Sequence, residues 1–233
     1  MQAEKSVGFL PEMIGERFFH MKGLRREETA APLIPEGCSL SELKEAAAGC
    51  RACPLWERGT QTVFGEGLLT SRLILVGEIP GDYEDRQGLP FVGPAGRVLD
   101  EALETAGIER TDAYVTNVVK HFKWIAQGKR RLHQKPNARE IGACLPWLDA
   151  EIDRIRPRVL VAMGATAAQA LLGKQVRVTR DHGRDLPTDR APFATATIHP
   201  SAILRSQTDE QRHAAMEQFV EDLRGVARKL EEG

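Results

Sequence analysis

Residues 73–82, with the sequence LILVGEIPGD, decide the fold of this chain. Residues 73–76 are a short apolar run rich in β-forming side chains, and a glycine-rich turn at 77–82 ends it. A continuous apolar run of this length is typical of a strand that is buried on both faces, as in a parallel sheet. The turn carries a carboxylate, Glu78, between glycines that would allow a ligand close to the backbone.

Three more apolar runs repeat this pattern further along the chain, at 113–119, 159–163 and 193–198. The helical patterns lie at 39–49, 95–106, 138–155, 165–172 and about 209–230. Strands that alternate with helices favour a parallel sheet covered on both faces. We therefore predict an α/β fold, a three-layer α/β/α domain with a central four-stranded parallel sheet.

The length and the charge of the chain set the next limits. With 233 residues the chain can bury a full core, and we predict one domain at 38–233 after an N-terminal extension at 1–37 that shows no sustained period. There are 32 basic and 33 acidic residues, so the net charge alone gives no argument for binding nucleic acid. Any such argument must rest on a local patch.

The sequence shows no sign of a membrane or secretory protein. No apolar run approaches the roughly 20 residues that span a bilayer, and the first residues lack the apolar core and cleavage site of a signal peptide. We expect a cytoplasmic monomer with no membrane partner. In that compartment the four cysteines are expected to be free or metal-bound rather than disulfide-bonded.

One segment, 120–139, is strongly basic. It holds seven lysines and arginines and no acidic residue: Lys120, Lys123, Lys129, Arg130, Arg131, Lys135 and Arg139. Most charge runs are solvated surface loops, but Phe122 and Trp124 lie among these cations, and aromatic side chains beside cations suit stacked bases. The segment also contains His133, a side chain suited to nucleophilic or proton-transfer chemistry near neutral pH. We predict a phosphate-facing loop.

Polar side chains follow three of the four predicted strands. They are Glu78 after the first strand, Asn117 in the second, and His199 and Ser201 after the fourth. Ligands of open parallel sheets bind outside the carboxyl ends of the strands. A solvated turn carboxylate and a satisfied strand-end amide remain the alternatives for Glu78 and Asn117. The predicted site lies at this end of the sheet.

The segment 89–96, LPFVGPAG, precedes a helix and offers free backbone N–H groups to an anion or a carbonyl oxygen. Its aromatic residue, Phe91, is more often a core residue than a stacking platform by about two to one. No P-loop is present, because eight residues separate Gly164 from Gly173-Lys174. Ser201 does not lie in a G-x-S-x-G elbow, and no complete hydrolase triad is found.

Cys50 and Cys53 form a C-x-x-C motif followed by a proline. The motif follows a helix rather than a strand of a βαβ unit, which argues against a thioredoxin-type redox pair. A metal would need further ligands, for which Cys38, His121 and Cys144 are candidates. An iron–sulfur cluster or zinc would suit this set, and buried structural cysteines remain the alternative for Cys38 and Cys144.

Five of these motifs, taken together and in this order, resemble the family-4, iron–sulfur-containing type of the uracil-DNA glycosylase superfamily. They are C-x-x-C-P at 50–54, GE-x-PG at 77–81, LPFVGPAG at 89–96, VTNVVK at 115–120 and IHPS at 198–201, and the resemblance covers about residues 39–230. It implies the uracil-DNA glycosylase fold, excision of uracil from DNA, and uracil-containing DNA and uracil as partners.

The segment KHFKW followed by GKRRLH is similar to the UdgX branch of that superfamily. Ordinary family-4 enzymes have a cysteine at the position of His121 and lack the basic insertion. In UdgX proteins the histidine of that insertion bonds covalently to the deoxyribose after uracil leaves, and by position this is His133. One departure is Ile79, where UdgX sequences often have glutamine.

The resemblance implies a role for each candidate residue. The expected catalytic residues are His133, Glu78 and His199. Substrate binding is expected from Gly77, Ile79, Gly81, Asp82, Phe91 and Asn117. DNA contacts are expected from Lys129, Arg130, Arg131, Ser201 and Arg205. The ligands of a cluster of the 4Fe-4S type are expected to be Cys50, Cys53, His121 and Cys144, with Cys38 left out.

These roles imply an enzyme of the uracil-DNA glycosylase class that repairs DNA in a single turnover. Phe91 stacks on the base, Asn117 separates uracil from cytosine, and His199 stabilises the departing anion. Glu78 stabilises the sugar cation or holds His133 neutral. The alternatives are a family-4 glycosylase with normal turnover, and a non-enzymatic protein that binds uracil-containing or abasic DNA reversibly.

Overall fold

The apolar run at 73–76 forms strand β1 (Leu73–Gly77), an inner strand of the central sheet. In the computed structural model, which describes residues 24–232, this sheet has four parallel strands in the order β2-β1-β5-β6. The other three are β2 (Ala113–Asn117), β5 (Val159–Met163) and β6 (Phe193–Thr197). The four predicted strands and their parallel arrangement are thus confirmed.

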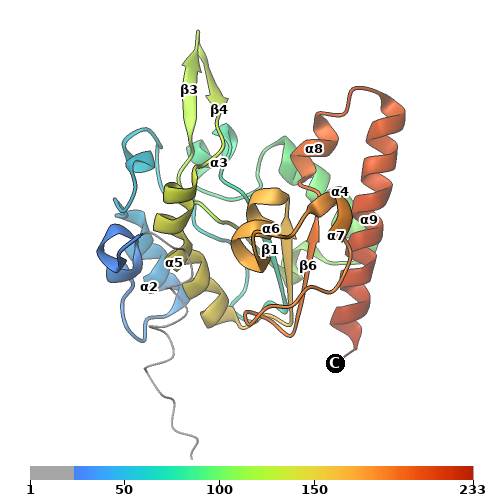
Figure 1. Ribbon diagram of the computed structural model, residues 1–233, viewed down its shortest axis with the longest axis horizontal. Coiled ribbons are helices and arrows are strands. Elements are labelled where there is room, and N and C mark those ends of the chain that lie inside the picture. Colours follow the sequence, from blue (N-terminus) through green and yellow to red (C-terminus); the bar gives the residue numbers. More distant parts are fainter. Residues whose placement is uncertain (1–23, 233) are drawn as a thin grey trace, which may run out of the picture.

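Helices cover both faces of the sheet (Figure 1). On one face α2 (Leu40–Ala48), α5 (Ala138–Ile155) and α6 (Ala165–Leu172) share a core with Ile74 and Val76. On the other face α4 (Pro94–Ala106) and α9 (Asp209–Glu231) share a core with Leu73 and Leu75. Alternate β1 side chains therefore point to opposite layers, as strand geometry requires. The predicted three-layer α/β/α architecture is confirmed.

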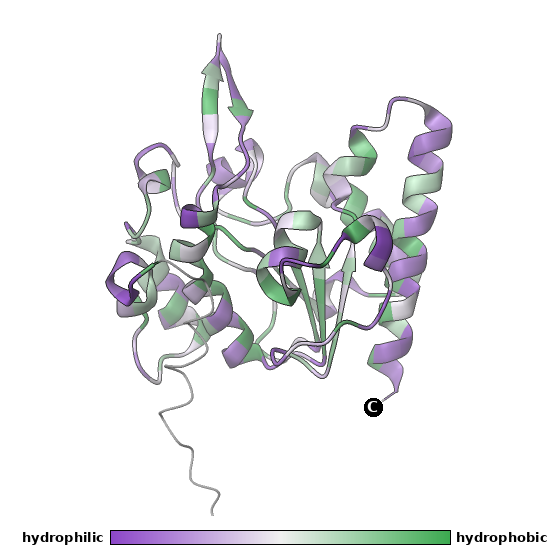
Figure 2. Cartoon of the chain, viewed as in Figure 1, coloured by the Kyte–Doolittle hydropathy of each residue, from purple (hydrophilic) through white to green (hydrophobic). Residues whose placement is uncertain are grey.

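The long helices begin where the sequence supplies a cap. The side-chain oxygens of Ser39, Asn137 and Thr208 accept hydrogen bonds from the backbone N–H groups three residues later, which start α2, α5 and α9. Helix α9 carries both polar and apolar residues along its length (Figure 2), and its buried residues are Phe219, Val220, Asp222, Leu223 and Val226. Helix α9 is therefore held by burial of one face, at about 25 cal/mol per Å² of apolar surface.

We expected the basic segment to be a loop, but the structure shows a β-hairpin. Strands β3 (Trp124–Gln127) and β4 (Arg130–His133) pair antiparallel, with Trp124 opposite His133 and Gln127 opposite Arg130. Only two residues connect them, and the first, Gly128, has a φ of +58°, which glycine adopts without strain. In Figure 1 the hairpin projects from the same end of the molecule as α8.

Several short helices were not predicted from the sequence. They are α3 (Asp82–Gln87), α7 (Val178–Asp181), α8 (Pro200–Leu204) and the 3₁₀ helices Arg26–Glu28, Ala31–Leu33, Pro54–Glu57 and Arg110–Asp112. Helices α3 and α8 follow directly after β1 and β6 at the carboxyl end of the sheet. They therefore lie where the predicted site residues cluster.

Part of the predicted N-terminal extension packs against the domain. The backbone N–H of Ala30 donates to the carbonyl oxygen of Ala143 at 2.8 Å, and Ala30 is fully buried. Residues 1–23 lie outside the described residues, so the boundary at residue 38 stays a prediction. Within residues 24–232, no helix combines the length and the apolar character needed to cross a bilayer.

Candidate active site

Asn117 and Phe91 meet over Gly77 at the carboxyl end of β1. A methyl group on Gly77 would lie 2.4 Å from the side-chain oxygen of Asn117 and 2.7 Å from the Phe91 ring. The Asn117 side chain is 3% exposed, yet its amide makes no hydrogen bond to any residue within 24–232. Buried amides are normally paired. This amide is therefore available to a ligand.

The backbone at Phe91 is strained. Its φ is +56°, a left-handed conformation that aromatic residues rarely adopt. Helix α4 accommodates it only because its third residue is Gly96, where a methyl group would lie 1.7 Å from the carbonyl oxygen of Phe91. Strain of this kind gathers at ligand sites, and here it fixes the ring over Gly77. Phe91 is 8% exposed and packs in the core with Leu99 and Ile203, so its core role is observed and its role as a platform for a base stays a proposal.

His199 lies on the other side of the Phe91 ring. The two rings stack, with centroids 6.0 Å apart and planes 29° apart. The Nδ1 atom of His199 accepts a hydrogen bond from the backbone N–H of Ser201 at 3.1 Å and contacts its hydroxyl at 2.8 Å. In the neutral imidazole the proton must then be on Nε2. His199 therefore presents one N–H donor to the site.

The charge state of His199 follows from its burial. Burial lowers its pKa to about 4, and the nearby cation Arg205 and His133 act in the same direction. The imidazole is thus neutral at neutral pH. A neutral donor suits a group that is to stabilise a developing negative charge without first being deprotonated.

Glu78 is aimed at the site by Thr166, the second residue of α6. The Thr166 hydroxyl donates a hydrogen bond to a carboxylate oxygen of Glu78. Strands β1 and β5 are neighbours, but the chain continues from β1 to β2 on one side and from β5 to β6 on the other. The strand order therefore reverses between β1 and β5, and ligands of open parallel sheets bind where it reverses. Sequence reasoning missed Thr166, which had been treated only as the start of a helix.

A second carboxylate, Glu84, joins the two glycine-rich turns. It is 8% exposed and accepts hydrogen bonds from the backbone N–H groups of Gly81 at 3.1 Å and Gly93 at 2.8 Å. It therefore holds the turn that carries Glu78 against the turn that carries Phe91. Glu84 was not among the predicted residues. It is the third residue of α3, a capping position that explains its bond to Gly81 but gives no sign of the bond to Gly93.

His133, at the end of β4, lies within electrostatic reach of this group. The residue is exposed, but desolvation by the surrounding groups lowers its pKa from the ordinary value of 6.5; Arg205 acts in the same direction, and Glu78 opposes both. The ring packs beside Phe122, with centroids 6.0 Å apart. Its nitrogens form no hydrogen bond within residues 24–232. His133 is therefore neutral at neutral pH and has a free lone pair.

Arg131 does not face solvent as a phosphate ligand would, so this expectation is corrected. Its side chain is 16% exposed, and its guanidinium pairs with Asp82 and with the fully buried Asp85, the latter at 2.6 Å. It also lies over the rings of Phe122 and Trp124. Arg131 thus fastens the hairpin to α3. Asp82, which we expected to bind substrate, is thus paired with Arg131.

The remaining predicted residues fall into two groups. Lys129 and Arg130 are exposed at the turn of the hairpin, and Arg205 is exposed and donates to the Ser201 hydroxyl at 3.0 Å. These side chains can reach a bound strand. Ile79 is 7% exposed and belongs to the core cluster with Val76, so its side chain contributes packing. Gly81 contributes its backbone N–H to Glu84.

The cysteines expected to hold a cluster are all buried and free. Cys50 accepts a hydrogen bond from the indole N–H of Trp147, and Cys144 accepts one from the backbone N–H of Lys120, both at 3.2 Å. Burial raises the thiol pKa of Cys144 and Cys53, and Cys50 and Cys53 contribute to the shift at Cys144, so the three lie near one another.

The fourth expected ligand, His121, contacts the Thr62 hydroxyl through Nε2 at 3.0 Å. Within residues 24–232 no group of three or more His, Cys, Asp or Glu side chains is arranged to hold a metal ion. Three neighbouring buried thiols, two of which accept hydrogen bonds from N–H groups, nevertheless form a donor set that fits an iron–sulfur cluster. Cys38 lies apart, with its carbonyl oxygen bonded to Arg154 at 2.6 Å.

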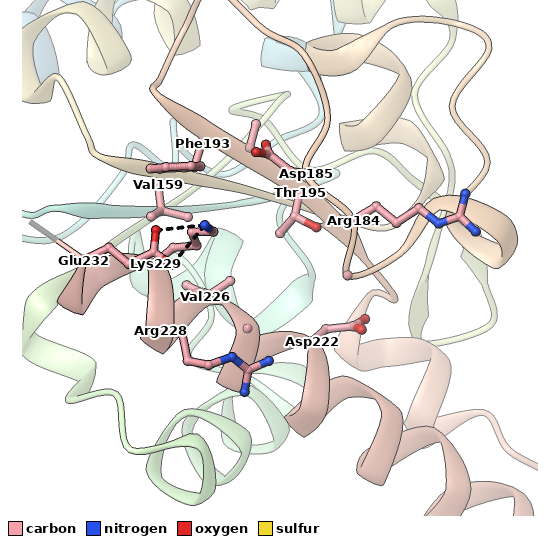
Figure 3. A pocket seen from close by; sticks show the side chains of 13 residues that line it. Val159, Arg184, Asp185, Phe193, Thr195, Asp222, Val226, Arg228, Lys229 and Glu232 are labelled. Carbon is pink, nitrogen blue, oxygen red and sulfur yellow. Dashed lines mark hydrogen bonds and ion pairs between the residues drawn. The ribbon is translucent and has the colours of Figure 1, made fainter.

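A separate pocket of about 340 Å³ lies between α9 and β6 (Figure 3). It is lined by Phe193, Thr195, Asp222 and Lys229 among others, and none of the predicted site residues reaches it. Asp222 is already paired with His182 and Thr197. The candidate active site is therefore the group at the carboxyl end of the sheet.

Comparison with known proteins agrees with this geometry. Residues 64–224 match the sequence model of the uracil DNA glycosylase superfamily. The type-4 uracil-DNA glycosylase of Thermotoga maritima is 39% identical over 176 residues, which cover 75% of this chain and 88% of the relative. The type-4 enzyme of Pyrobaculum aerophilum is 36% identical, with coverage of 71% and 85%. That of Sulfurisphaera tokodaii is 34% identical, with coverage of 71% and 76%. The chain therefore belongs to the uracil-DNA glycosylase superfamily.

Proposed function

We propose that this protein excises uracil from DNA and is then captured, through His133, as a covalent adduct with the deoxyribose. Excision is supported by membership of the superfamily and by the relatives' names. Capture is supported by one observation above the others: a neutral histidine with free nitrogens lies beside the site on a hairpin that the protein fastens in place. On this proposal the chain belongs to the UdgX branch.

Base recognition rests on Phe91 and Asn117. A uracil flipped out of its strand stacks on the fixed Phe91 ring, and the Asn117 amide hydrogen-bonds its edge. Held in one orientation, the amide accepts from N3–H and donates to the C4 carbonyl of uracil, whereas cytosine presents an acceptor and a donor in the opposite order and would need the amide turned over. The amide makes no hydrogen bond within residues 24–232, so binding uracil would supply partners for both its donor and its acceptor.

Bond cleavage rests on His199 and Glu78. As the N1–C1′ bond breaks, its electron pair leaves with uracil, and negative charge develops on a carbonyl oxygen of the base. The Nε2–H of His199 donates to that oxygen. The sugar becomes an oxocarbenium-like cation, which the carboxylate of Glu78 stabilises from the end of β1. Thr166 holds the carboxylate in place.

Capture follows without water. A lone pair of His133 attacks C1′, a C–N bond forms, and the imidazolium that results loses its other ring proton, directly or through solvent, to the departing uracil anion. A nucleophile held near C1′ has an advantage over passing water of up to about 10⁵ M in effective concentration. On this proposal the new C–N bond persists, so each molecule reacts once.

We further propose that Cys50, Cys53, His121 and Cys144 hold an iron–sulfur cluster of the 4Fe-4S type. A cluster held by these residues would supply structural cross-linking between the 50–53 segment, the segment that follows β2 and helix α5. The residues themselves, through Trp147 and the backbone at Lys120, orient the sulfur atoms. No step of the reaction passes through this site.

Lys129 and Arg130 at the hairpin turn, with Arg205 and Ser201 on α8, are proposed to contact phosphates on either side of the flipped nucleotide. Each cation that neutralises a phosphate contributes to affinity that falls with salt. Arg131 is left out of this set, because Asp82 and Asp85 already neutralise it.

The test uses uracil-containing single-stranded DNA and denaturing gels. The wild-type protein is expected to give a band that survives boiling in SDS, and His133→Ser is expected to lose that band. The matched control, Gln134→Ser, changes the neighbouring residue and should keep it. If free uracil and abasic DNA form but no band is retained, capture is excluded and the protein is a glycosylase with normal turnover. A salt-labile complex with no release of uracil would leave a reversible binding protein.

A further inference from the structure

A buried ion pair joins Lys120, just beyond β2, to Glu151 in α5. Lys120 is 1% exposed and Glu151 is fully buried, and Nζ of Lys120 lies 2.5 Å from the carboxylate. The carboxylate also accepts hydrogen bonds from the Tyr114 hydroxyl at 3.0 Å and the backbone N–H of Gly65 at 2.9 Å. Burial and the adjacent carboxylate raise the pKa of Tyr114, so the phenol stays a donor.

Lys120 also holds the end of strand β2 directly. Its Nζ donates to the carbonyl oxygen of Asn117 at 2.9 Å and to the Thr116 hydroxyl at 2.5 Å. After Asn117 the chain leaves the sheet, and Val118 and Val119 donate their N–H groups back to the turn after β1. The ammonium group therefore fixes the peptide plane of Asn117, whose side chain projects into the site.

Stability alone does not explain such a pair. Replacing a buried ion pair with apolar side chains of similar volume is often neutral or stabilising, because two charges no longer have to be desolvated. Phe64, whose ring lies 5.4 Å from Nζ, shows that apolar neighbours are already present. A charged pair at this place is therefore better explained by the geometry that it imposes on Asn117.

We propose that Lys120, neutralised by Glu151, is the positioning residue of Asn117 and so of the discrimination between uracil and cytosine. Lys120 touches no substrate atom. It acts by holding the Asn117 carbonyl, which sets the direction of the side-chain amide over Gly77. This inference rests on the proposed role of Asn117 in recognising the base.

The test replaces both charges at once. Lys120→Met/Glu151→Leu removes the pair without leaving a buried charge alone, but Tyr114 and the Gly65 N–H lose their acceptor, so the variant is expected to fold with a lowered melting temperature. The matched control is Arg190→Met/Asp149→Leu, which removes the 2.9 Å pair between Arg190 and the same helix away from the site. All proteins are compared well below their melting temperatures.

The expected result is a loss of selectivity rather than of fold. Single-turnover release of uracil from single-stranded DNA should fall by about 10²-fold, the effect of a misplacement near 1 Å. The affinity for uracil-containing over cytosine-containing strands should fall with it, and the control should match the wild type. If the Leu variant does not fold, Lys120→Met/Glu151→Gln keeps an acceptor for Tyr114, and the same loss is expected.

Two failures can be told apart. A wild-type protein that releases no uracil and binds uracil-containing and cytosine-containing strands equally overturns the proposed function. A wild type that releases uracil, beside a folded double variant of equal rate and equal selectivity, overturns only the positioning role of Lys120.

Discussion

Replacing Gly77 with alanine should disable recognition of the base and leave the fold intact. The new methyl group would lie 2.4 Å from the Asn117 amide oxygen, where ordinary contact begins at 3.4 Å, so the amide must retreat by about 1 Å. The Phe91 ring, at 2.7 Å, must also give way. A displacement of about 1 Å near the reacting group can cost about 10²-fold in rate.

The same variant should lose little stability. Overpacking by one methyl group costs about 1–3 kcal/mol, and at this chain length each kcal/mol lowers Tm by about 2–4 °C. The assay is single-turnover release of uracil with protein in excess, beside a thermal melt. Gly49→Ala is the matched control, because a methyl group there meets nothing within 4 Å and its φ is −94°. A Gly77→Ala protein that releases uracil within a few-fold of the wild-type rate would refute the placement of Asn117 and Phe91.

Three further predictions concern the hairpin, the pH and the cysteines. Arg131→Met should free the hairpin and reduce the yield of adduct on denaturing gels, while uracil release persists. Arg130→Met should weaken DNA binding, mainly at higher salt. Equal losses of adduct in the two variants would contradict the different roles given to the two arginines. Because the pKa of His133 lies below 6.5, the imidazole keeps its lone pair above that pH. The rate of adduct formation should therefore be level from pH 8 to 6.5 and fall only in more acid solution. A rate that already falls between pH 8 and 6.5 would contradict a neutral nucleophile. Cys144→Ala should lose bound iron and the visible absorbance of a cluster and Cys38→Ala should keep both, while the opposite pattern would put Cys38 among the ligands.

The sheet could be predicted because each strand is a continuous apolar run. Residues buried on both faces, as in β1 and β5, leave little choice of secondary structure, and Ser39 and Asn137 mark where helices begin. The polar residues at the strand ends could be predicted to cluster for the same reason, since parallel strands end at one edge.

The hairpin could not be predicted in this way. Its strands have four residues each and are mostly exposed, so neither an apolar run nor a strong alternation marks them. Gly128 at the turn was the one available signal. The partners of Arg131 lie 49 and 46 residues away along the chain, and nothing local shows that α3 would bring them near.

The strain at Phe91 and the clasp made by Glu84 could not be predicted either. Both depend on how two turns meet in space: Gly96 admits the Phe91 carbonyl, and Gly81 and Gly93 converge on one carboxylate. Glycines in the sequence show only that such close approaches are allowed. The pairing of Lys120 with Glu151, 31 residues apart, is likewise a property of the fold.

The most direct measurement is the mass of the product formed from the wild-type protein and a uracil-containing single strand. We predict one protein and one strand joined, lighter than their sum by one uracil, with the modified peptide mapping to His133 and no second round of release. An unmodified protein that turns over many strands, or an adduct of the same mass on His133→Ser protein, would contradict capture by this histidine.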